Sequence, residues 1–445
     1  MLKKHISLLM ILYAFIGCSV SNNNINNDIN KDKLDSLFIS YSSNDKFMGS
    51  VTVSKEGKVI YQKSVGYEDI EKKKIATNMT LYKIGSISKT FTSALIFKAI
   101  EENKITLDTK LNKFFPEIVN SDVIDINLLL SHRSGIHNFT ANDGYLSWAA
   151  QKKDRNELMK IIEDGGSDFK PDSLFSYSNS NYVILSFILE DIYNTSFENI
   201  LDKKIIKPLK LKNTFYCDSN NIERKACCSY LFTNNWTKDQ DTHPTVTKGA
   251  GGIVSTTEDL NIFYNSLFNF KVVCKESLAE MTNIKDGGGK GLFQIPFYET
   301  FGFGHSGGID GFASISIYFP KDKITYSLTS NGVNCVINDI TIAVLEAAYN
   351  KDFKIPSFKK QIISQDILNE LTGTYSSNDF PLKIVVRNNN GALEAQATGQ
   401  NSFMLDADNE NVFKNMRYGI IMTFNRENNL LTLSQSGKLI KFVKE

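Results

Sequence analysis

The alternation of apolar and polar residues predicts strands near both ends of residues 31–352. Residues 49–54 and 58–63 alternate around a Lys-Glu-Gly turn, so a β-hairpin is expected. Near the other end, residues 312–328 contain two alternating runs, and a helical pattern follows over residues 337–349. Helical periodicity dominates between these ends. One antiparallel sheet built from both ends of the region and flanked by helices accounts for this order.

From Leu371 onward the pattern changes to short strands separated by turns that contain Asn and Gly. Examples are residues 383–387, 393–398, 420–424 and 430–434. Such a texture is typical of a small β-barrel or β-sandwich. We therefore expect one domain over residues 31–352 and a second over residues 370–445, joined by a linker over residues 353–369.

Residues 217–247 are polar and have no clear periodicity. We expect an irregular surface segment over the core, followed by a helix capped by Thr256 or Thr257. No local rule gives the conformation of such a segment. The specificity of a pocket that it lines is therefore not predicted from the sequence.

The N-terminus has the features of a targeting segment. Lys3 and Lys4 precede an apolar run over residues 6–16, which is too short to span a membrane comfortably. The run ends in Phe15-Ile16-Gly17-Cys18, which resembles a bacterial lipobox, so residues 1–18 are expected to be a lipoprotein signal with Cys18 as the lipidated residue. Residues 19–30 are polar and would form a flexible tether. The expected location is the bacterial cell envelope, lipid-anchored to a membrane and facing the periplasm or the cell surface; plain secretion is the alternative.

Composition excludes some classes of partner. The chain has 445 residues, 42% of them apolar and 22% charged, with a formal net charge of +1. This balance gives no reason to expect a nucleic-acid partner. Six cysteines are present, but they do not combine with paired histidines into a recognisable zinc-ligand pattern, so no metal site is expected. The sequence does not indicate an oligomeric state.

The most informative chemical motif is the Ser86-x-x-Lys89 pair, which opens a strongly apolar helical pattern. Residues three apart lie on the same side of a helix, so the lysine amine would lie beside the serine hydroxyl. A partly desolvated lysine can take the proton of a serine and make it a nucleophile. The helix N-terminus also favours a developing anion. By itself, the pair also fits a capped, exposed helix start.

Two other segments carry candidate chemistry. Tyr177-Ser178-Asn179 opens a helix; the tyrosine could share proton transfer with a nearby lysine, which would favour the phenolate, and the Asn179 amide could hold a substrate carbonyl. Gly304-His305-Ser306-Gly307-Gly308 would let a substrate backbone approach a strand and could supply N–H groups to an oxyanion hole. Each also fits a purely structural role. For the turn over residues 129–135, which includes His132, we expect only a structural role.

Taken in order, these motifs resemble the serine β-lactamase and penicillin-binding-protein superfamily. The matching elements are Ser86-x-x-Lys89, Leu-Leu-Ser-His-Arg-Ser-Gly-Ile over residues 129–136, Tyr177-x-Asn179 and His305-x-Gly307. The resemblance covers residues 31–349. Within this superfamily, the motifs most resemble the branch that holds class C β-lactamases, D-alanyl-D-alanine carboxypeptidases, D-aminopeptidases and β-lactamase-like esterases.

The resemblance implies an α+β fold, with an antiparallel sheet flanked by helices and an inserted all-helical region. It also implies that the C-terminal β-barrel is lipocalin-like. The implied reaction is covalent acyl transfer: Ser86 attacks, Lys89 and Tyr177 carry the proton, and Asn179, His305, Gly307 and Gly308 bind the substrate. The backbone N–H groups of Ser86 and Gly308 would form the oxyanion hole. No cofactor and no metal is implied, and the substrate is a small molecule or peptide.

One departure from the family pattern bears on the substrate. β-Lactamases of this branch carry Lys-Thr-Gly where this chain has His305-Ser306-Gly307. A lysine there gives a permanent charge for the carboxylate of the antibiotic, whereas a histidine is mostly neutral at neutral pH. We therefore favour an ester or an amide that contains a D-amino acid. A true β-lactamase and a non-catalytic receptor for peptidoglycan fragments are the alternatives.

Overall fold

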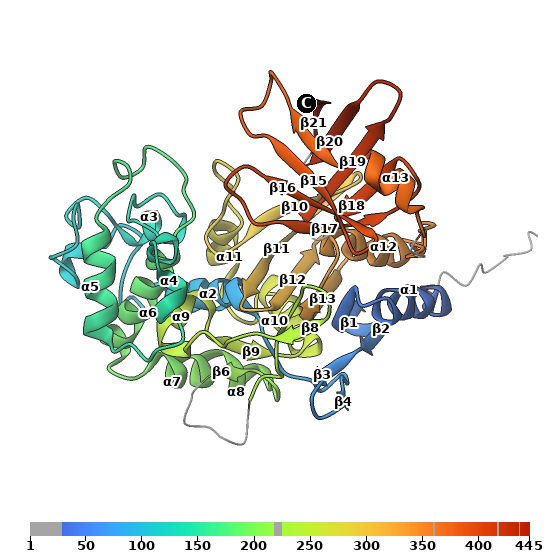
Figure 1. The fold of residues 1–445 in the computed structure, drawn as a ribbon. Helices are drawn as coiled ribbons and strands as arrows, with labels where there is room; N and C mark the ends of the chain where they lie inside the picture. Colours follow the sequence, from blue (N-terminus) through green and yellow to red (C-terminus); the bar gives the residue numbers. More distant parts are fainter. Residues whose placement is uncertain (1–28, 218–224, 359–360, 416–417, 436) are drawn as a thin grey trace, which may run out of the picture.

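The computed structural model describes residues 29–217, 225–358, 361–415, 418–435 and 437–445. Its chain forms a mixed sheet-and-helix region followed by a separate barrel (Figure 1). The candidate lipidation residue Cys18 lies outside the described ranges. No helix within those ranges is both long and apolar enough to cross a bilayer.

The central sheet joins both ends of the first region, as the sequence predicts. Its main path runs β10-β11-β12-β13-β1-β2, and β1 pairs antiparallel with β13, with Val51 opposite Leu328. Two short strands extend it: β7 pairs with β13, and β8 pairs with β7. The strands are β1 (Phe47–Lys55), β2 (Lys58–Val65), β7 (Tyr230–Phe232), β8 (Trp236–Lys238), β10 (Phe293–Phe297), β11 (Thr300–Ile309), β12 (Phe312–Phe319) and β13 (Ile324–Val333).

The expectation for residues 217–247 is wrong in part. We expected an irregular segment, but β7 and β8 form a hairpin within it, and β7 joins the main sheet through Tyr230 opposite Gly332. Three-residue strands carry too little alternation to be recognised in a polar sequence. The hairpin anchors the residues after β8 beside the sheet.

Both faces of the sheet are covered. The apolar side chains of β1, such as Val51 and Val53, pack with helices α1 (Lys31–Ser43) and α12 (Ile337–Ala348). The opposite face carries small hydroxyl side chains that bond to helix α10 (Thr257–Phe268): Thr52 Oγ1 lies 2.7 Å from Thr257 Oγ1, and Asn261 donates to Ser54 over 2.9 Å. Thr256 caps α10, which confirms one of the two expected caps.

A second core fills the helix-rich part, drawn on the left of Figure 1. Helices α2 and α6 run through this core and bury long apolar stretches. The helices here are α2 (Ser88–Glu101), α3 (Ile126–Leu130), α4 (Tyr145–Trp148), α5 (Arg155–Gly165), α6 (Asn179–Tyr193), α7 (Phe197–Leu201), α8 (Lys207–Leu209), α9 (Pro244–Gly251) and α11 (Lys275–Met281), with short 3-10 turns at Gly85–Ile87 (η1), Leu111–Lys113 (η2) and Phe139–Ala141 (η3) and a π-helical turn at Asp202–Ile206 (η4).

Small strands connect the two cores and place the segment that contains Ser86. Strand β9 (Ile253–Ser255) pairs antiparallel with both β5 (Tyr82–Lys83) and β6 (Phe215–Tyr216). Strands β3 (Tyr67–Asp69) and β4 (Lys74–Ile75) form a separate ribbon. Ile84, directly after β5, donates its N–H to Ile253 O over 3.0 Å, so the chain enters the 3-10 turn at Ser86 from a fixed position.

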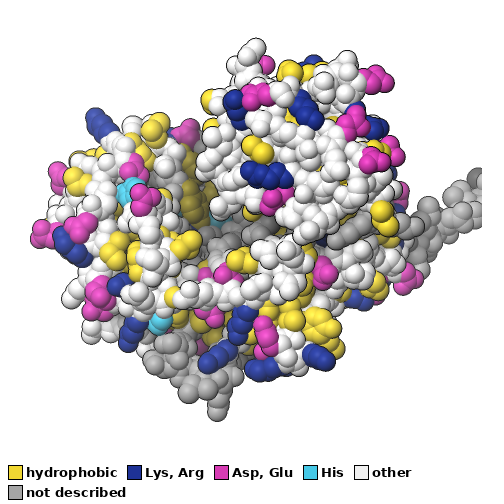
Figure 2. All heavy atoms as spheres, in the orientation of Figure 1, with side chains coloured by type: hydrophobic (Ala, Val, Ile, Leu, Met, Phe, Trp, Pro, Cys, Tyr) yellow, Lys and Arg dark blue, Asp and Glu magenta, His cyan; other side chains and the backbone are white. Residues whose placement is uncertain are grey.

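The C-terminal strands close into an eight-stranded antiparallel barrel with its own apolar core. Helix α13 (Gln365–Glu370) precedes it and places Leu368 in that core. The strands are β14 (Gly373–Ser376), β15 (Ile384–Asn389), β16 (Ala392–Ala397), β17 (Phe403–Ala407), β18 (Val412–Asn415), β19 (Ile420–Asn425), β20 (Leu430–Gln435) and β21 (Lys438–Lys444). Figure 2 shows charged side chains of both signs scattered over the visible face, and a hollow between the helix-rich part and the barrel.

Candidate active site

Ser86 lies in the 3-10 turn (η1) that leads directly into α2. Gly85 before it has a φ of +49°, and a Cβ at this residue would lie 2.9 Å from the Gly308 nitrogen. Both features require glycine. The turn therefore lies directly against the end of strand β11, and Ser86 comes close to Gly308.

Lys89 lies one turn beyond Ser86 and is fully buried. Its Nζ atom donates to Ser86 Oγ over 3.1 Å, to Asn179 Oδ1 over 2.7 Å and to the Ala250 carbonyl over 2.8 Å. Burial lowers the pKa of Lys89 well below its ordinary value, because an enclosed ammonium has lost its hydration. A lysine that is neutral near physiological pH can accept the Ser86 proton.

Tyr177 lies over the lysine, with Lys89 Nζ 4.9 Å from its ring centre. Its buried hydroxyl is close enough to Ser86 for the serine to lower its pKa slightly, yet it makes no hydrogen bond of normal geometry within the described residues. Burial outweighs this effect and raises the pKa of Tyr177. We expected the lysine to favour the phenolate, but burial raises the pKa of Tyr177 and also lowers the pKa of Lys89, which disfavours the cation. Tyr177 is better suited to donate a proton than to take one.

Asn179 begins helix α6, as expected from the sequence. Its Oδ1 accepts from Lys89, while its Nδ2 donates to Thr140 Oγ1 over 2.9 Å, and its backbone N–H donates to Asn138 Oδ1 over 3.0 Å. The amide is thus oriented by partners on both sides. Asn138 and Thr140 could not be recognised from the sequence, because neither belongs to a motif.

The turn over residues 129–135 holds the Tyr177 segment in place. His132 has a φ of +56° and accepts the Ser178 N–H on Nδ1 over 3.1 Å. Its ring lies 4.3 Å from that of Tyr177, and Ser134 Oγ donates to Asn181 Oδ1 over 2.7 Å. This agrees with the structural role expected for the turn, and it identifies the positioning of Tyr177 as that role.

The side chain of His305 points into the protein rather than into open space. It is 3% exposed, its Nδ1 donates to the carbonyl of Ser306, and its Nε2 has no partner among the described residues. Burial lowers the pKa of His305 to about 3. The imidazole is therefore neutral at any ordinary working pH and offers no positive charge to a substrate.

Gly307 and Gly308 form the edge of the site. A Cβ on Gly307 would lie 2.1 Å from the Ile84 carbonyl oxygen, whereas a Cβ on Gly308 would meet no atom within 4 Å. Gly307 therefore lets β11 pack against the chain that carries Ser86. Gly308 faces open space, where its N–H and that of Ser86 could receive an oxyanion.

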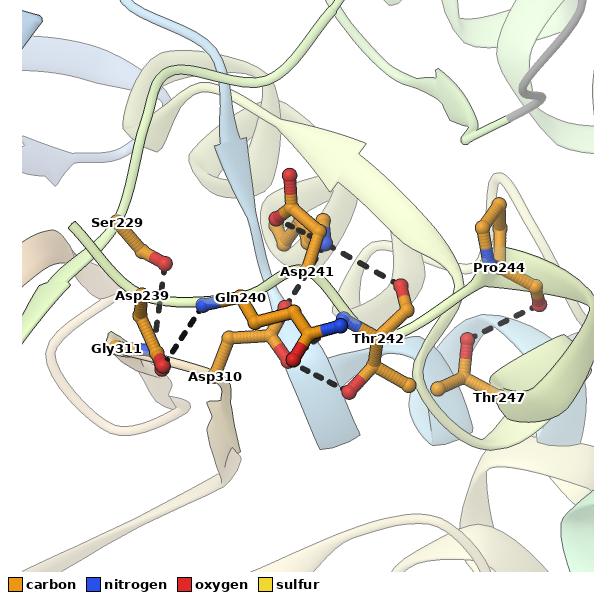
Figure 3. Close-up of polar contacts among 10 residues, drawn as sticks. Ser229, Asp239, Gln240, Asp241, Thr242, Pro244, Thr247, Asp310 and Gly311 are labelled. Atoms are coloured by element: carbon orange, nitrogen blue, oxygen red, sulfur yellow. Dashed lines mark hydrogen bonds and ion pairs between the residues drawn. The ribbon is translucent and has the colours of Figure 1, made fainter. Parts of the chain in front are cut away.

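A cleft of about 1030 Å³ opens at Ser86. Ser86, Asn179 and Gly308 line it, whereas Lys89, Tyr177, Gly307 and His305 are not among its described lining residues. Four aspartates also line the cleft: Asp143, Asp239, Asp241 and Asp310. No Lys, Arg or His is among the described residues that line it. Figure 3 shows three of these aspartates brought together from the segment after β8 and the end of β11.

Comparisons with known proteins agree with this geometry. A family model described as Beta-lactamase matches residues 45–345. The teichoic acid D-alanine hydrolase of Staphylococcus aureus (strain MRSA252) is 28% identical over 235 residues, which are 52% of this chain and 57% of that protein. The chain thus matches little more than half the length of this relative.

Solved structures share the fold. A penicillin-binding protein homologue from Pyrococcus abyssi, described as octameric, has a TM-score of 0.65 at 22% identity and covers 92% of this chain and 99% of its own. A D-amino acid amidase from Ochrobactrum anthropi SV3 has a TM-score of 0.64 at 22% identity and covers 72% of this chain and 99% of its own. The expected α+β fold with a C-terminal barrel is confirmed.

Proposed function

Because the chain belongs to the beta-lactamase family, we propose that it is a serine hydrolase that works through an acyl-enzyme on Ser86. The observation that carries the proposal is the fully buried Lys89 with its Nζ 3.1 Å from Ser86 Oγ. A buried amine beside a hydroxyl at the start of a helix has the arrangement that nucleophilic catalysis needs.

The reaction begins when Ser86 Oγ bonds to the substrate carbonyl carbon and its proton moves to Lys89 Nζ. The carbonyl electron pair moves onto oxygen, which the N–H groups of Ser86 and Gly308 stabilise. The bond to the leaving group then breaks, and the leaving group takes a proton from the Tyr177 hydroxyl, which Lys89 restores. Water attacks the acyl-enzyme by the reverse sequence and releases the acid.

We propose that the substrate is an ester or amide of a D-amino acid. The neutral His305 supplies no cation for a carboxylate, and the described lining of the cleft contains no other one. This argues against efficient hydrolysis of β-lactams, whose carboxylate needs a positive partner. The relatives named above act on the D-alanine of teichoic acid and on D-amino acid amides, which is consistent with this class.

We also propose that the protein works in the bacterial cell envelope, held at a membrane by a lipid on Cys18. The lipobox-like sequence supports the anchor, and the teichoic acid hydrolase among the relatives supports the location. Mass spectrometry of the protein extracted from membranes would test the anchor. A diacylglyceryl mass on a mature chain that begins at Cys18 is expected, and an unmodified N-terminus contradicts it.

Fluorophosphonate labelling of a soluble form that begins after Ser21 tests the catalytic proposal. The wild-type protein should label at one site, and Ser86→Ala should abolish the label while the melting temperature stays unchanged. A folded protein that does not label contradicts the proposal. Mixing the same protein with a simple penicillin separates substrates: intact drug and unmodified protein are expected, whereas rapid hydrolysis of the drug would identify a β-lactamase.

A further inference from the structure

The cleft at Ser86 carries a negative charge that the proposed chemistry does not use. Four of its described lining residues are aspartates and none is basic. The nearest cation, Lys83, lies beneath the surface, with its side chain 8% exposed. Its Nζ pairs with Asp241 over 2.6 Å and with Asp310 over 2.8 Å. Lys83 therefore forms ion pairs with two of the four carboxylates.

Both carboxylate oxygens of Asp310 have partners within the protein. Its side chain is 3% exposed; one oxygen accepts from Lys83, and the other accepts from the N–H and the hydroxyl of Thr242 over 3.0 and 2.6 Å (Figure 3). Asp310 and Lys83 thus form a neutral, buried pair that fixes the segment after β8. The Asp241 side chain is 65% exposed and adds its charge at the surface of the cleft.

Asp239 has no cation of its own among the described residues. Its Oδ1 accepts the Gln240 N–H over 2.8 Å, and its own N–H donates to the Ser229 carbonyl over 2.9 Å. Burial raises the pKa of Asp239, and repulsion from Asp310 and Asp241 adds to this shift, while the Gln240 N–H and Lys83 offset it only in part. A carboxylate in this situation is stabilised by a ligand that brings a positive charge.

The backbone places these aspartates near the reaction centre. Lys83 comes three residues before Ser86, so their Cα atoms are at most about 11 Å apart. Asp310 comes two residues after Gly308, on the same strand end. Asp239, Asp241 and Asp310 line the same cleft as Ser86, so a substrate that Ser86 attacks would lie in a space that these carboxylates border.

We propose that Asp239, assisted by Asp241, recognises the ammonium group of the substrate, so that the enzyme selects acyl groups with a free, protonated amine. The inference rests on the proposed function and adds to it the requirement for an uncapped amine. Asp310 and Lys83 act as the scaffold that holds the two carboxylates at the cleft.

The test compares D-alanine methyl ester with N-acetyl-D-alanine methyl ester, in which an acetyl group caps the amine and removes its charge. Near pH 6.5 the α-amino group of the first is protonated. The wild-type enzyme should prefer it by at least about tenfold in kcat/KM, the size expected for a hydrogen bond to a charged group, and Asp239→Asn should remove most of that preference. Asp239→Glu should restore part of it, and added salt should weaken it.

Asp122→Asn is the matched control, because Asp122 is an exposed aspartate on a loop outside the cleft. It should leave both rates unchanged. Fluorophosphonate labelling of each variant reports a folded, reactive Ser86. A wild-type enzyme that labels but shows equal rates for the two esters, or cleaves neither, overturns the inference and leaves the serine mechanism intact. Loss of labelling in the wild type would instead overturn the proposed function.

Discussion

Four ionisable side chains around Ser86 are enclosed so completely that burial determines their protonation. Burial lowers the pKa values of Lys89, His132 and His305 and raises that of Tyr177. Each shift favours the neutral form, because a low-dielectric surrounding penalises whichever form is charged. Burial thus favours a neutral reaction centre, whereas the aspartates that line the cleft carry negative charge.

Lys89 should set the acidic limb of the pH profile. A base must be deprotonated to act, so kcat/KM should fall as the pH drops below the pKa of Lys89, which lies well below the ordinary value of a lysine. Steady-state rates on D-alanine methyl ester between pH 5 and 9 measure this limb.

Variants at Lys89 test whether this lysine is the base. Lys89→Ala should lose about 10²–10⁴-fold in kcat/KM, the usual contribution of a general base. Lys98→Ala is the control, since Lys98 lies on the same helix but donates to the Val272 carbonyl, away from Ser86. If Lys89→Ala keeps more than a tenth of the activity, Lys89 is not the base.

His305 should make the protein less stable in acid. Its folded pKa is about 3, whereas an unfolded histidine has a pKa near 6.5. Between these values the unfolded chain binds a proton that the folded chain does not. The free energy of unfolding should therefore fall by about 1.4 kcal/mol per pH unit below pH 6 on account of this residue. Urea unfolding at pH 6.0, 5.0 and 4.5 measures the slope.

His305→Gln should remove that part of the slope. His137→Gln is the control, because Asp168 raises the pKa of His137, so that this residue is protonated in both states below pH 6. Its variant should keep the wild-type slope between pH 6.0 and 4.5. An unchanged slope in His305→Gln would mean that the imidazole is protonated in the folded protein.

At the scale of elements, alternation predicts the hairpin and the closing strands but not what covers them. Every residue of β1 from Phe47 to Ser54 is buried, although half of them are polar or Gly. A strand in which apolar and polar residues alternate normally has one face exposed to solvent. Here the hydroxyls of Thr52 and Ser54 bond to α10, a contact between segments 200 residues apart that no local pattern contains.

The candidate site, like the sheet, could be predicted from the sequence only in part. Motif spacing places Lys89 beside Ser86 and Asn179 at a helix start, because both follow from helix geometry. It does not give the direction of the His305 side chain, which depends on packing against Phe293 and Tyr177. Asp239 and Asp241 belong to a polar segment without periodicity, so their place at the cleft follows only from the fold.

The contact between β11 and the Ser86 turn should be intolerant of one methyl group. In Gly307→Ala, the new Cβ would lie 2.1 Å from the Ile84 oxygen, so the strand must move away from the turn. A loss of about 1–3 kcal/mol in stability is expected from such overpacking, together with a slower reaction of Ser86 with fluorophosphonate.

Gly308→Ala is the matched control on the same strand, since its Cβ meets no atom within 4 Å. Its free energy of unfolding should stay within about 0.5 kcal/mol of the wild type. Calorimetry measures both variants. Equal stabilities would show that β11 does not press on the turn as described.

At the scale of the whole molecule, three apolar cores divide the chain. Two lie in the sheet-and-helix region, and the third fills the barrel. Lys46 in the first region pairs with Asp406 of the barrel over 2.9 Å, and Ser40 donates to the Pro356 carbonyl in the connecting segment. None of the described barrel residues lines the cleft.

These facts predict that a chain ending at Phe358 folds and reacts without the barrel. It keeps both cores of the first region, including the ring of Phe358 against Tyr41, and it loses the ion pair of Lys46, which is worth about 1 kcal/mol at a half-exposed partner. Its fluorophosphonate labelling rate should stay within about threefold of the full chain. Asp406→Asn in the full chain is the control for the lost ion pair, and its labelling rate should also stay within about threefold of the full chain. If the short chain labels more than tenfold more slowly while Asp406→Asn does not, the barrel shapes the active site through contacts other than this pair.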